Sequence, residues 1–300
     1  VNLAAQNIPI ESRIVILCQV PPGFTLRMKK YHSKISYQVE TLVFGQAFSR
    51  AVTPERIIVG MDNPEIPLDA NFAYLLGQFS CPILVMNYES AEFTKISINA
   101  FLAASITTTN SLNEIAKSIG ADWDSVKKAL QLDRRIGPYA YLKPGLGIAG
   151  GNIERDLQTL DELGSVISAE TGLFRTFLSN SEHQKKWILE EISSLISATN
   201  PKVSIGILGV AYKPGVGDVR ETPASELRDH LILQGAEVGW NDPLVPTWED
   251  TEPVDLGWEC DVAILATKQP GMDIEALIAR GIRILDCTNS LKNRVGVTLL

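Results

Sequence analysis

The sequence has few cysteines and no long apolar run. Its four cysteines are far apart and show no CxxC spacing, so we expect neither a zinc site nor a disulfide framework, and a reducing cytoplasm fits best. No apolar stretch reaches the roughly 18 residues typical of a membrane span, and the opening VNLAAQNIPIE lacks the basic and apolar regions of a signal peptide. The sequence therefore predicts a cytoplasmic protein without a metal site or a membrane partner.

Basic residues are outnumbered by acidic ones. The 27 Lys and Arg against 35 Asp and Glu give a net charge of −8, which argues against nucleic acid as the main partner, because binding a phosphate backbone needs clustered cations. A single local basic site for a small anion remains compatible with this charge. With 300 residues, of which 45% are hydrophobic, the chain is long enough for two or three globular domains.

The first part of the chain predicts an α/β sheet. Three short β-branched or apolar runs indicate buried strands over Arg13–Val20, Arg56–Gly60 and Pro82–Asn87. Three strands with so little helix are too few for a complete doubly wound domain, so we expect the second half of one. Residue 1 is Val rather than Met, and we expect the natural chain to begin earlier.

Helical periodicity begins at Ser90, where apolar residues recur every three or four positions. It continues over Asp122–Leu132 and over a long segment from about Asp156 to Ile196, broken by Gly164 and Gly172. The middle of the chain is therefore predicted to be helical.

An α/β pattern returns after residue 202. We predict one helix, Pro223–Gly235, among four strands, and this βαβ series indicates a parallel sheet that binds ligands at the carboxyl ends of its strands. The predicted strands are Val203–Val210, Ala236–Pro243, Asp261–Thr267 and Arg283–Asn289.

Two segments invite comparison with dinucleotide-binding loops. GLGIAG, Gly145–Gly150, has GxGxxG spacing but follows LKP rather than a strand, so the context that places a pyrophosphate at a helix N-terminus is missing, and we predict a flexible loop. GILGVAYKPG, Gly206–Gly215, follows a strand but lacks the spacing. It predicts either a nucleotide at the end of that strand or a sheet core with a tight turn.

Five segments carry a more specific signal when they are taken in order along the chain. They are VPPG (Val20–Gly23), TPERIIVG (Thr53–Gly60), SAEFTKISINAFLA (Ser90–Ala103), RIGPYAYLKPGLGIAGG (Arg135–Gly151) and GVAYKPGVGDVRETP (Gly209–Pro223). Together they resemble the nucleotide-sugar 6-dehydrogenases, the UDP-glucose and GDP-mannose dehydrogenase family. The resemblance covers nearly the whole chain.

This resemblance implies a three-part architecture. Residues 1–88 would be the second half of an NAD-binding Rossmann domain, residues 89–198 a helical dimerisation region with the substrate loop, and residues 199–300 a C-terminal Rossmann-like domain that binds a nucleotide sugar, foremost a UDP-sugar. It implies a homodimer through the central helices, NAD as cofactor and a place in polysaccharide biosynthesis. Because the family's glycine-rich NAD loop falls in the part expected to be absent, the chain as given should bind NAD poorly, with Val20, Pro21 and Arg220 as its remaining cofactor contacts.

The family oxidises a sugar C6 alcohol twice, to a carboxylate, with two NAD and a Cys thiolate that forms a thiohemiacetal and then a thioester. By resemblance, Lys95 and Asn99 are the donors that stabilise the oxyanions, since i and i+4 share one helix face. The alternative for this pair is a solvated Lys and a surface Asn. Asp156 and Glu40 match the family's proton-transfer carboxylates. The implied substrate-binding residues are Arg135, Tyr141, Gly145, Gly147, Gly150 and Lys213.

Four positions depart from the family pattern. Asn152 stands where the catalytic Cys is expected, Gln19 where a Thr holds water, Phe44 where a second carboxylate lies, and Thr288 where relatives carry an Arg. An amide cannot form the covalent adduct. Two hypotheses follow: an NAD-dependent dehydrogenase whose reaction is impaired or altered, or a catalytically inactive nucleotide-sugar-binding homologue or partner subunit.

Overall fold

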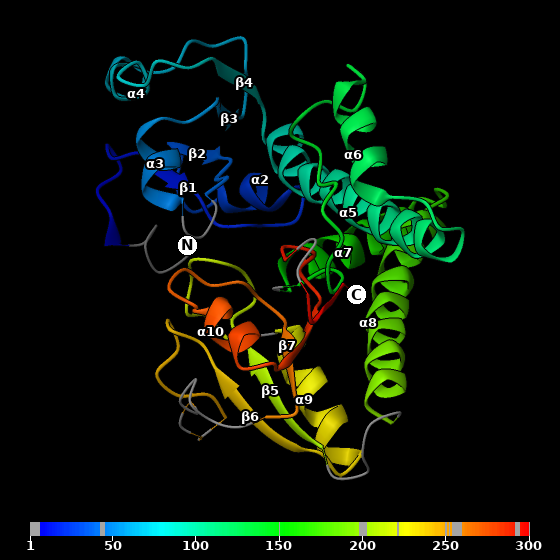
Figure 1. Cartoon of the computed structure of the whole chain (residues 1–300). Coiled ribbons are helices and arrows are strands. Elements are labelled where there is room, and N and C mark those ends of the chain that lie inside the picture. The colour runs from blue at the N-terminus through cyan, green and yellow to red at the C-terminus, as the bar shows by residue number, and fades with distance from the viewer. Residues whose placement is uncertain are drawn as a thin grey trace. The chain divides into compact units, whose positions relative to one another are not determined.

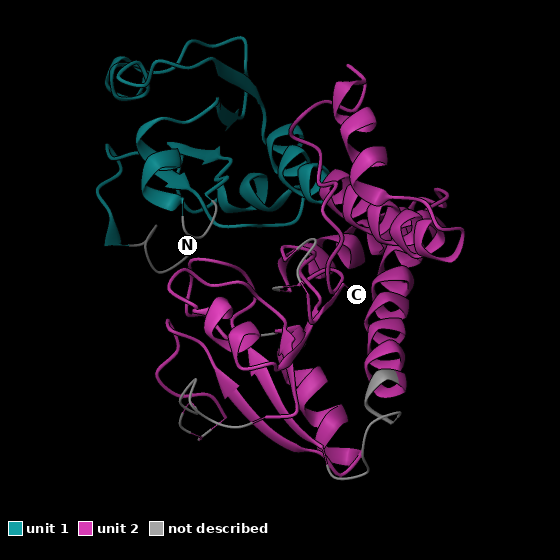
Figure 2. Ribbon diagram, in the orientation of Figure 1, with its two compact units in different colours: residues 1–99 teal, residues 100–300 magenta. Residues whose placement is uncertain are grey.

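The structure, a computed structural model, describes residues 7–42, 46–149, 151–197, 203–220, 222–249, 251, 253, 260–291 and 295–299. The chain divides into two compact units, residues 1–99 and residues 100–300 (Figure 2). Both units contain a β-sheet with helices, so the α/β class predicted from the sequence is confirmed. The division into three domains at residues 88 and 198 stays a prediction.

The first unit is built on a four-stranded sheet in the order β1-β2-β3-β4 (Figure 1). β1 and β2 are parallel, β2 and β3 are antiparallel, and β3 and β4 are parallel. The strands are Ile14–Ile16, Ile35–Gln38, Ile57–Met61 and Ile83–Asn87.

The sequence-based account of this sheet was wrong in two places. It missed β2, because Ser36 and Gln38 dilute the apolar content of ISYQ, although Ile35, Ser36 and Tyr37 are all buried. It also carried the first strand to Val20, whereas β1 ends at Ile16 and pairs with β2 over three residues only.

Three helices cover the two faces of this sheet: α2 (Phe24–Met28), α4 (Ala70–Leu76) and the start of α5 (Tyr88–Ser118). The short helix α3 (Ala47–Val52) precedes β3 and has no buried residue. On one face Ala91 of α5 packs with Tyr37 of β2. On the other face Phe72 and Leu76 of α4 pack on β3.

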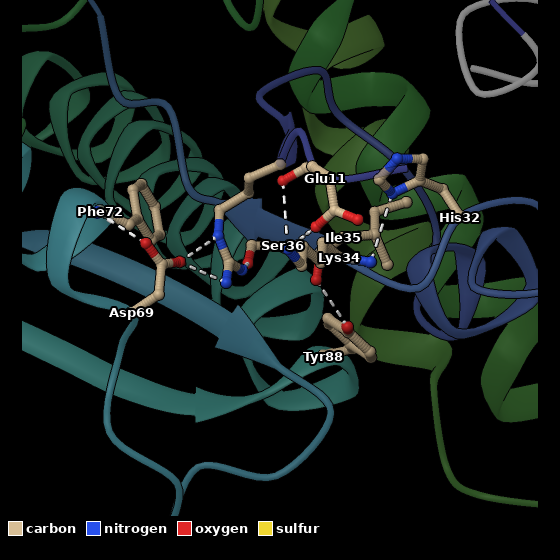
Figure 3. Close-up of polar contacts among 9 residues, drawn as sticks. Glu11, His32, Lys34, Ile35, Ser36, Asp69, Phe72 and Tyr88 are labelled. Carbon is tan, nitrogen blue, oxygen red and sulfur yellow. Dashed lines mark hydrogen bonds and ion pairs between the residues drawn. The ribbon is translucent and has the colours of Figure 1, made fainter. Parts of the chain in front are cut away.

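Polar contacts tie these elements together at the beginning of β1 and β2 (Figure 3). Arg13 donates to Asp69 Oδ2 from Nε at 2.6 Å and to Ser36 Oγ at 2.5 Å, while Asp69 Oδ1 accepts from the N–H of Phe72 at 3.0 Å and so caps α4. The Tyr88 hydroxyl, at the start of α5, donates to the carbonyl oxygen of Ile35 at 2.8 Å. The start of α5 is thereby fixed to this sheet.

The second unit begins with a helical layer that contains the rest of α5, α6 (Trp123–Leu132), α7 (Asn152–Val166) and α8 (Gly172–Ser197). A break between two long helices is confirmed at Gly172, where α8 begins, but the break predicted at Gly164 is wrong. Gly164 itself lies inside α7, where an added Cβ would meet Thr171 Cγ2 at 1.9 Å. Its absent side chain lets the Thr171 side chain approach α7 closely.

A five-stranded parallel sheet completes the second unit, in the order β6-β5-β7-β8-β9. The predicted strands β5 to β8 and the helix α9 are confirmed, whereas α10 and β9 were not predicted. The elements are β5 (Ser204–Leu208), α9 (Pro223–Leu233), β6 (Glu237–Asn241), β7 (Val262–Leu265), α10 (Ile274–Ala279), β8 (Arg283–Asp286) and β9 (Val297–Leu299).

The direction of winding reverses in the middle of this sheet. From β5 the chain passes through α9 to β6 on one side, and it then crosses to β7 on the other side. Helices α8 and α9 cover one face and α10 covers the other, around fully buried Ile205, Ile207 and Ile264. The carboxyl ends of β5 and β7 flank this reversal, which is where open α/β sheets bind their ligands.

Candidate functional site

A cavity of about 190 Å³ lies at this reversal, within the second unit. Residues 212–214 follow β5, residues 266–268 follow β7, and residues 287–288 follow β8; all three segments line the cavity. The remaining wall consists of the loop 143–147 with Ala149 and of residues 222–224 at the start of α9.

The lining of the cavity carries positive charge, which suits an anion. Three lysines line the cavity, Lys143, Lys213 and Lys268, and none of the described lining residues is Asp or Glu, on a chain whose net charge is −8. The N-terminus of α9 adds the partial positive charge of a helix end. Burial lowers the pKa of Lys213, whose ammonium lies 5.2 Å from the ring centre of Tyr212.

The turn after β5 does not offer its backbone to a dinucleotide. Val210 and Ala211 donate their N–H groups to Asp242 Oδ2 at 3.0 and 3.1 Å, and all three residues are buried. An internal carboxylate thus occupies the donors that a pyrophosphate would need in a Rossmann turn. Of the two interpretations of this segment, a tight turn in the sheet core describes residues 209–211, and a ligand-lining loop describes residues 212–214.

Gln269 holds the loop that carries Lys213. The Gln269 side chain accepts from the N–H of Gly215 at 2.7 Å and donates to the carbonyl oxygen of Val216 at 2.8 Å. The Gln269 residue is 3% exposed, so a buried amide holds the loop.

The GLGIAG segment is a loop, as predicted, and it contributes to the cavity. Gly145 and Gly147 line the cavity, and Gly147 has a φ of +98° in the left-handed region. An added Cβ there would also lie 2.8 Å from Ser181 Oγ. Gly150 lies outside the described residues.

Three further predicted binding residues do not line the cavity. Tyr141 is bound through its backbone, which accepts from Thr109 Oγ1 at 2.7 Å. Arg135 and Arg220 have largely exposed side chains that pair with Asp133 and Asp218, each at 2.6 Å. Their roles toward substrate and cofactor stay predictions.

Asn152 and Asp156 lie one turn apart at the start of α7. The Asn152 side-chain oxygen accepts from Arg155 Nη2 at 3.0 Å, and Asp156 is 2% exposed. The family spacing between these two positions is therefore kept on one helix face, with an amide where a thiol would be needed.

Lys95 and Asn99 lie on α5 in the first unit, again one turn apart. Val20 and Pro21 follow β1, and Glu40 follows the neighbouring parallel strand β2, so these residues share one edge of the sheet. The Glu40 carboxylate accepts from the N–H of Leu42. Phe44 lies outside the described residues.

The sequence-based reasoning missed two of the lysines in the cavity. Lys268 directly follows a predicted strand, and the rule that ligands bind at carboxyl ends of parallel strands could have found it. Lys143 precedes the glycine loop by two positions and had no such signal. Thr288 does line the cavity, and its hydroxyl donates to Asp286 at 2.7 Å.

The described residues hold no group of three or more His, Cys, Asp or Glu side chains that could bind a metal ion. No described helix is long and apolar enough to cross a membrane. NAD does not fit the two candidate loops, because one has its amides bound to Asp242 and the other follows no strand.

Two family models match the chain. The central domain of the UDP-glucose/GDP-mannose dehydrogenase family matches residues 89–182, and the UDP binding domain of the same family matches residues 206–293. The second match contains most of the cavity lining.

Curated relatives agree with these matches. The UDP-glucose 6-dehydrogenase of Rickettsia bellii is 27% identical over 77% of this chain and 55% of its own length, and that of Rattus norvegicus is 30% identical over 69% and 43%. The chain thus spans about half the length of the curated relatives it matches.

Solved structures share the fold. A UDP-glucose dehydrogenase from Pyrobaculum islandicum has a TM-score of 0.85 at 24% identity, with 99% of this chain and 72% of that chain covered. A UDP-D-ManNAc dehydrogenase from Pyrococcus horikoshii has a TM-score of 0.80 at 22% identity, with 99% and 73% covered.

Proposed function

Because this chain belongs to the UDP-glucose/GDP-mannose dehydrogenase family, we propose that it binds a nucleotide sugar, foremost a UDP-sugar, in the cavity at the carboxyl ends of β5 and β7. The observation that carries the proposal is the set of three lysines, Lys143, Lys213 and Lys268, among the described residues that line the cavity. A diphosphate is the part of a nucleotide sugar that needs such cations. The nucleotide would lie against the loops after β5 and β7, with its phosphates toward the lysines.

The proposed activity is oxidation of the sugar at C6. Lys95 and Asn99 would donate hydrogen bonds to the oxygen at C6 as negative charge develops there. Asp156 and Glu40 would accept or deliver protons. These roles come from the family resemblance and from the spacing of the residues on α5 and α7.

NAD is assigned no role in these steps, because the described loops do not fit its phosphates. The contacts of Val20, Pro21 and Arg220 with a nicotinamide cofactor are part of the proposal by resemblance only. The same holds for a role in polysaccharide biosynthesis and for a cytoplasmic location.

Asn152 separates the two forms of the proposal. Without a thiolate no thiohemiacetal forms, so the second oxidation cannot proceed through a thioester. Either the protein carries out an impaired or altered oxidation, or it is a catalytically inactive nucleotide-sugar-binding homologue or partner subunit. The retained Lys95, Asn99 and Asp156 favour the first form. The four departures from the family pattern favour the second; they are Gln19, Phe44, Asn152 and Thr288.

Calorimetric titration with UDP, UDP-glucose and GDP-mannose tests the binding. We expect a UDP-containing ligand to bind, and Lys213→Met to weaken it roughly tenfold through the loss of one cation at the phosphates. Absence of binding by all three ligands would contradict the proposal.

Formation of NADH from NAD and a panel of UDP- and GDP-sugars then separates the two forms, once calorimetric titration has shown that the protein tested binds NAD. Turnover by the wild-type chain supports the dehydrogenase. Binding without turnover in both the wild-type chain and Asn152→Cys supports the inactive homologue, whereas recovery by Asn152→Cys alone counts against it.

We also propose a homodimer through the central helices. Exposed apolar side chains lie along one face of α5 and continue one residue past its end; they are Phe101 (80% exposed), Leu112 (41%), Ile115 (53%) and, after the helix, Ile119 (73%). Light scattering after gel filtration should give twice the chain mass, and Ile115→Asp should give the monomer. A monomeric wild-type chain would overturn the homodimer proposal.

A further inference from the structure

The glycine loop of the cavity has no helix or strand of its own to hold its peptide groups. Instead, side chains from the helical layer bind its backbone. Thr109 of α5 donates to the carbonyl oxygen of Tyr141 at 2.7 Å, and Trp123 of α6 donates to that of Leu142 at 3.1 Å. The loop conformation is therefore set by neighbouring helices rather than by local structure.

Gly145 is held at both of its polar groups. Asn110 of α5 accepts from the Gly145 N–H at 3.0 Å, and Gln184 of α8 donates to the Gly145 carbonyl oxygen at 3.2 Å. Asn110 is 1% exposed and Gln184 is 2% exposed. Two buried side-chain amides from different helices thus bind the backbone of Gly145. Gly145 is also a lining residue of the cavity.

The next contact along the loop leaves little freedom either. Ser181 of α8 accepts from the N–H of Ile148 at 2.8 Å, and the same hydroxyl lies where a side chain on Gly147 would have to be. The loop between Lys143 and Ile148 is consequently anchored at the residues that follow the lysine.

We infer that Asn110 and Gln184 are positioning residues that fix the loop wall of the cavity and hold Lys143 at the anion. The inference rests on the proposed nucleotide-sugar binding. It assigns to the α5–α8 pair a second role besides packing, because hydrogen bonds from both helices converge on one residue of the ligand site, Gly145. A ligand site gains affinity when its walls are fixed before the ligand arrives.

The test replaces each amide by an apolar side chain of similar shape, Asn110→Leu and Gln184→Met, in the full chain. Asn180→Leu is the matched control, since the Asn180 side chain donates to Ser111 Oγ at 2.7 Å and also links α8 to α5 without touching the loop. Hydrogen exchange without ligand is followed by mass spectrometry. We expect exchange of the loop amides 145–148 to rise about tenfold in both variants and to stay unchanged in Asn180→Leu.

The second measurement is the affinity for UDP, combined in a double-mutant cycle with Lys143→Ala. Gln184→Met should weaken UDP binding about tenfold. Lys143→Ala should have a smaller effect in that background than in the wild type, because a displaced Lys143 contributes less to the affinity for UDP. If one apolar variant fails to fold, the other carries both measurements.

Unchanged loop exchange in a folded Asn110→Leu or Gln184→Met variant would overturn the inference, as would equal effects from Asn180→Leu or strict additivity with Lys143→Ala. If the wild-type chain binds no UDP, the proposed function fails. The exchange experiment still decides whether Asn110 and Gln184 hold the loop.

Discussion

The carboxylate of Glu92 accepts a hydrogen bond from the N–H of Thr25 at 2.7 Å, and its other oxygen accepts from the N–H of Gly23 at 2.5 Å. Glu92 is fully buried on α5, one turn before Lys95. It therefore fixes the turn that follows Val20 and Pro21 to the helix that carries the predicted oxyanion donors. Replacement by Gln leaves one acceptor and points an NH₂ group at the second N–H.

Glu92→Gln should lower the free energy of unfolding of the first unit by about 2 kcal/mol, the usual cost of losing a buried hydrogen bond to a charged group. Urea denaturation followed by circular dichroism measures it. Glu89→Gln is the control, because no hydrogen bond to the Glu89 side chain is present among the described residues and both changes remove one charge from the start of α5. Equal stability of the two variants would show that the buried carboxylate does not hold the turn.

The sequence predicted the first sheet only in part, for a physical reason. Strands β3 and β4 are continuous apolar runs and were found. β2 was missed because Ser36, fully buried, is satisfied by Arg13, which directly precedes β1. A pairing between residues 23 positions apart leaves no periodic signal in the local sequence.

Gly209 directly follows β5 and lies close to Thr267, which follows β7. Its φ is +77°, and an added Cβ would lie 1.7 Å from the carbonyl oxygen of Thr267. Because that atom belongs to the backbone, the clash cannot be relieved by a side-chain rotation. Gly209→Ala should therefore destabilise the second unit by about 4 kcal/mol or more, or prevent folding.

Gly235→Ala separates this clash from backbone strain. Gly235 ends α9 with a φ of +84°, but nothing lies within 4 Å of its added Cβ. Its cost should be about 1 kcal/mol, that of a left-handed alanine. Similar urea midpoints for the two variants would contradict the close approach at β7.

The candidate site was predicted unevenly along the chain. Lys213 and the glycine loop were found because they carry residue types in a recognisable order. Asp242 and Gln269 could not be found, since their effect depends on which backbone groups they reach across the sheet. Buried polar side chains that hold loops leave no pattern of their own in a single sequence.

Cys287 lines the cavity, but we expect its thiol to be unreactive toward alkylating reagents. Burial raises the pKa of its thiol to about 12, so at pH 8 it stays protonated, and the thiolate is the reactive form. Cys18 is exposed. Iodoacetamide should therefore label Cys18 in the folded protein and leave Cys287 unlabelled until urea is added, as read by peptide mass spectrometry. Comparable labelling of both cysteines in the folded protein would contradict the burial of Cys287.

Lys213 gives the site a predictable dependence on pH. Burial holds its pKa below the ordinary value of 10.5, so the ammonium loses its proton at a lower pH than that of an exposed lysine. Affinity for UDP should fall as pH rises through this alkaline range, because the cation disappears. The stability of the ligand-free protein should move the other way: the unfolded chain binds more protons between the folded and unfolded pKa values, so this group's contribution to stability rises with pH.

Lys213→Arg is the decisive control, since arginine keeps its charge throughout that range and the nucleotide's own titration is common to both proteins. UDP affinities from calorimetry between pH 7 and 10 should decline more steeply for the wild type than for Lys213→Arg. Thermal unfolding without ligand should show the wild type gaining stability relative to the Arg variant over the same range. Parallel affinity profiles for the two proteins would mean that Lys213 does not contact the anion. Lys143 and Lys268 would then be the cations that bind it.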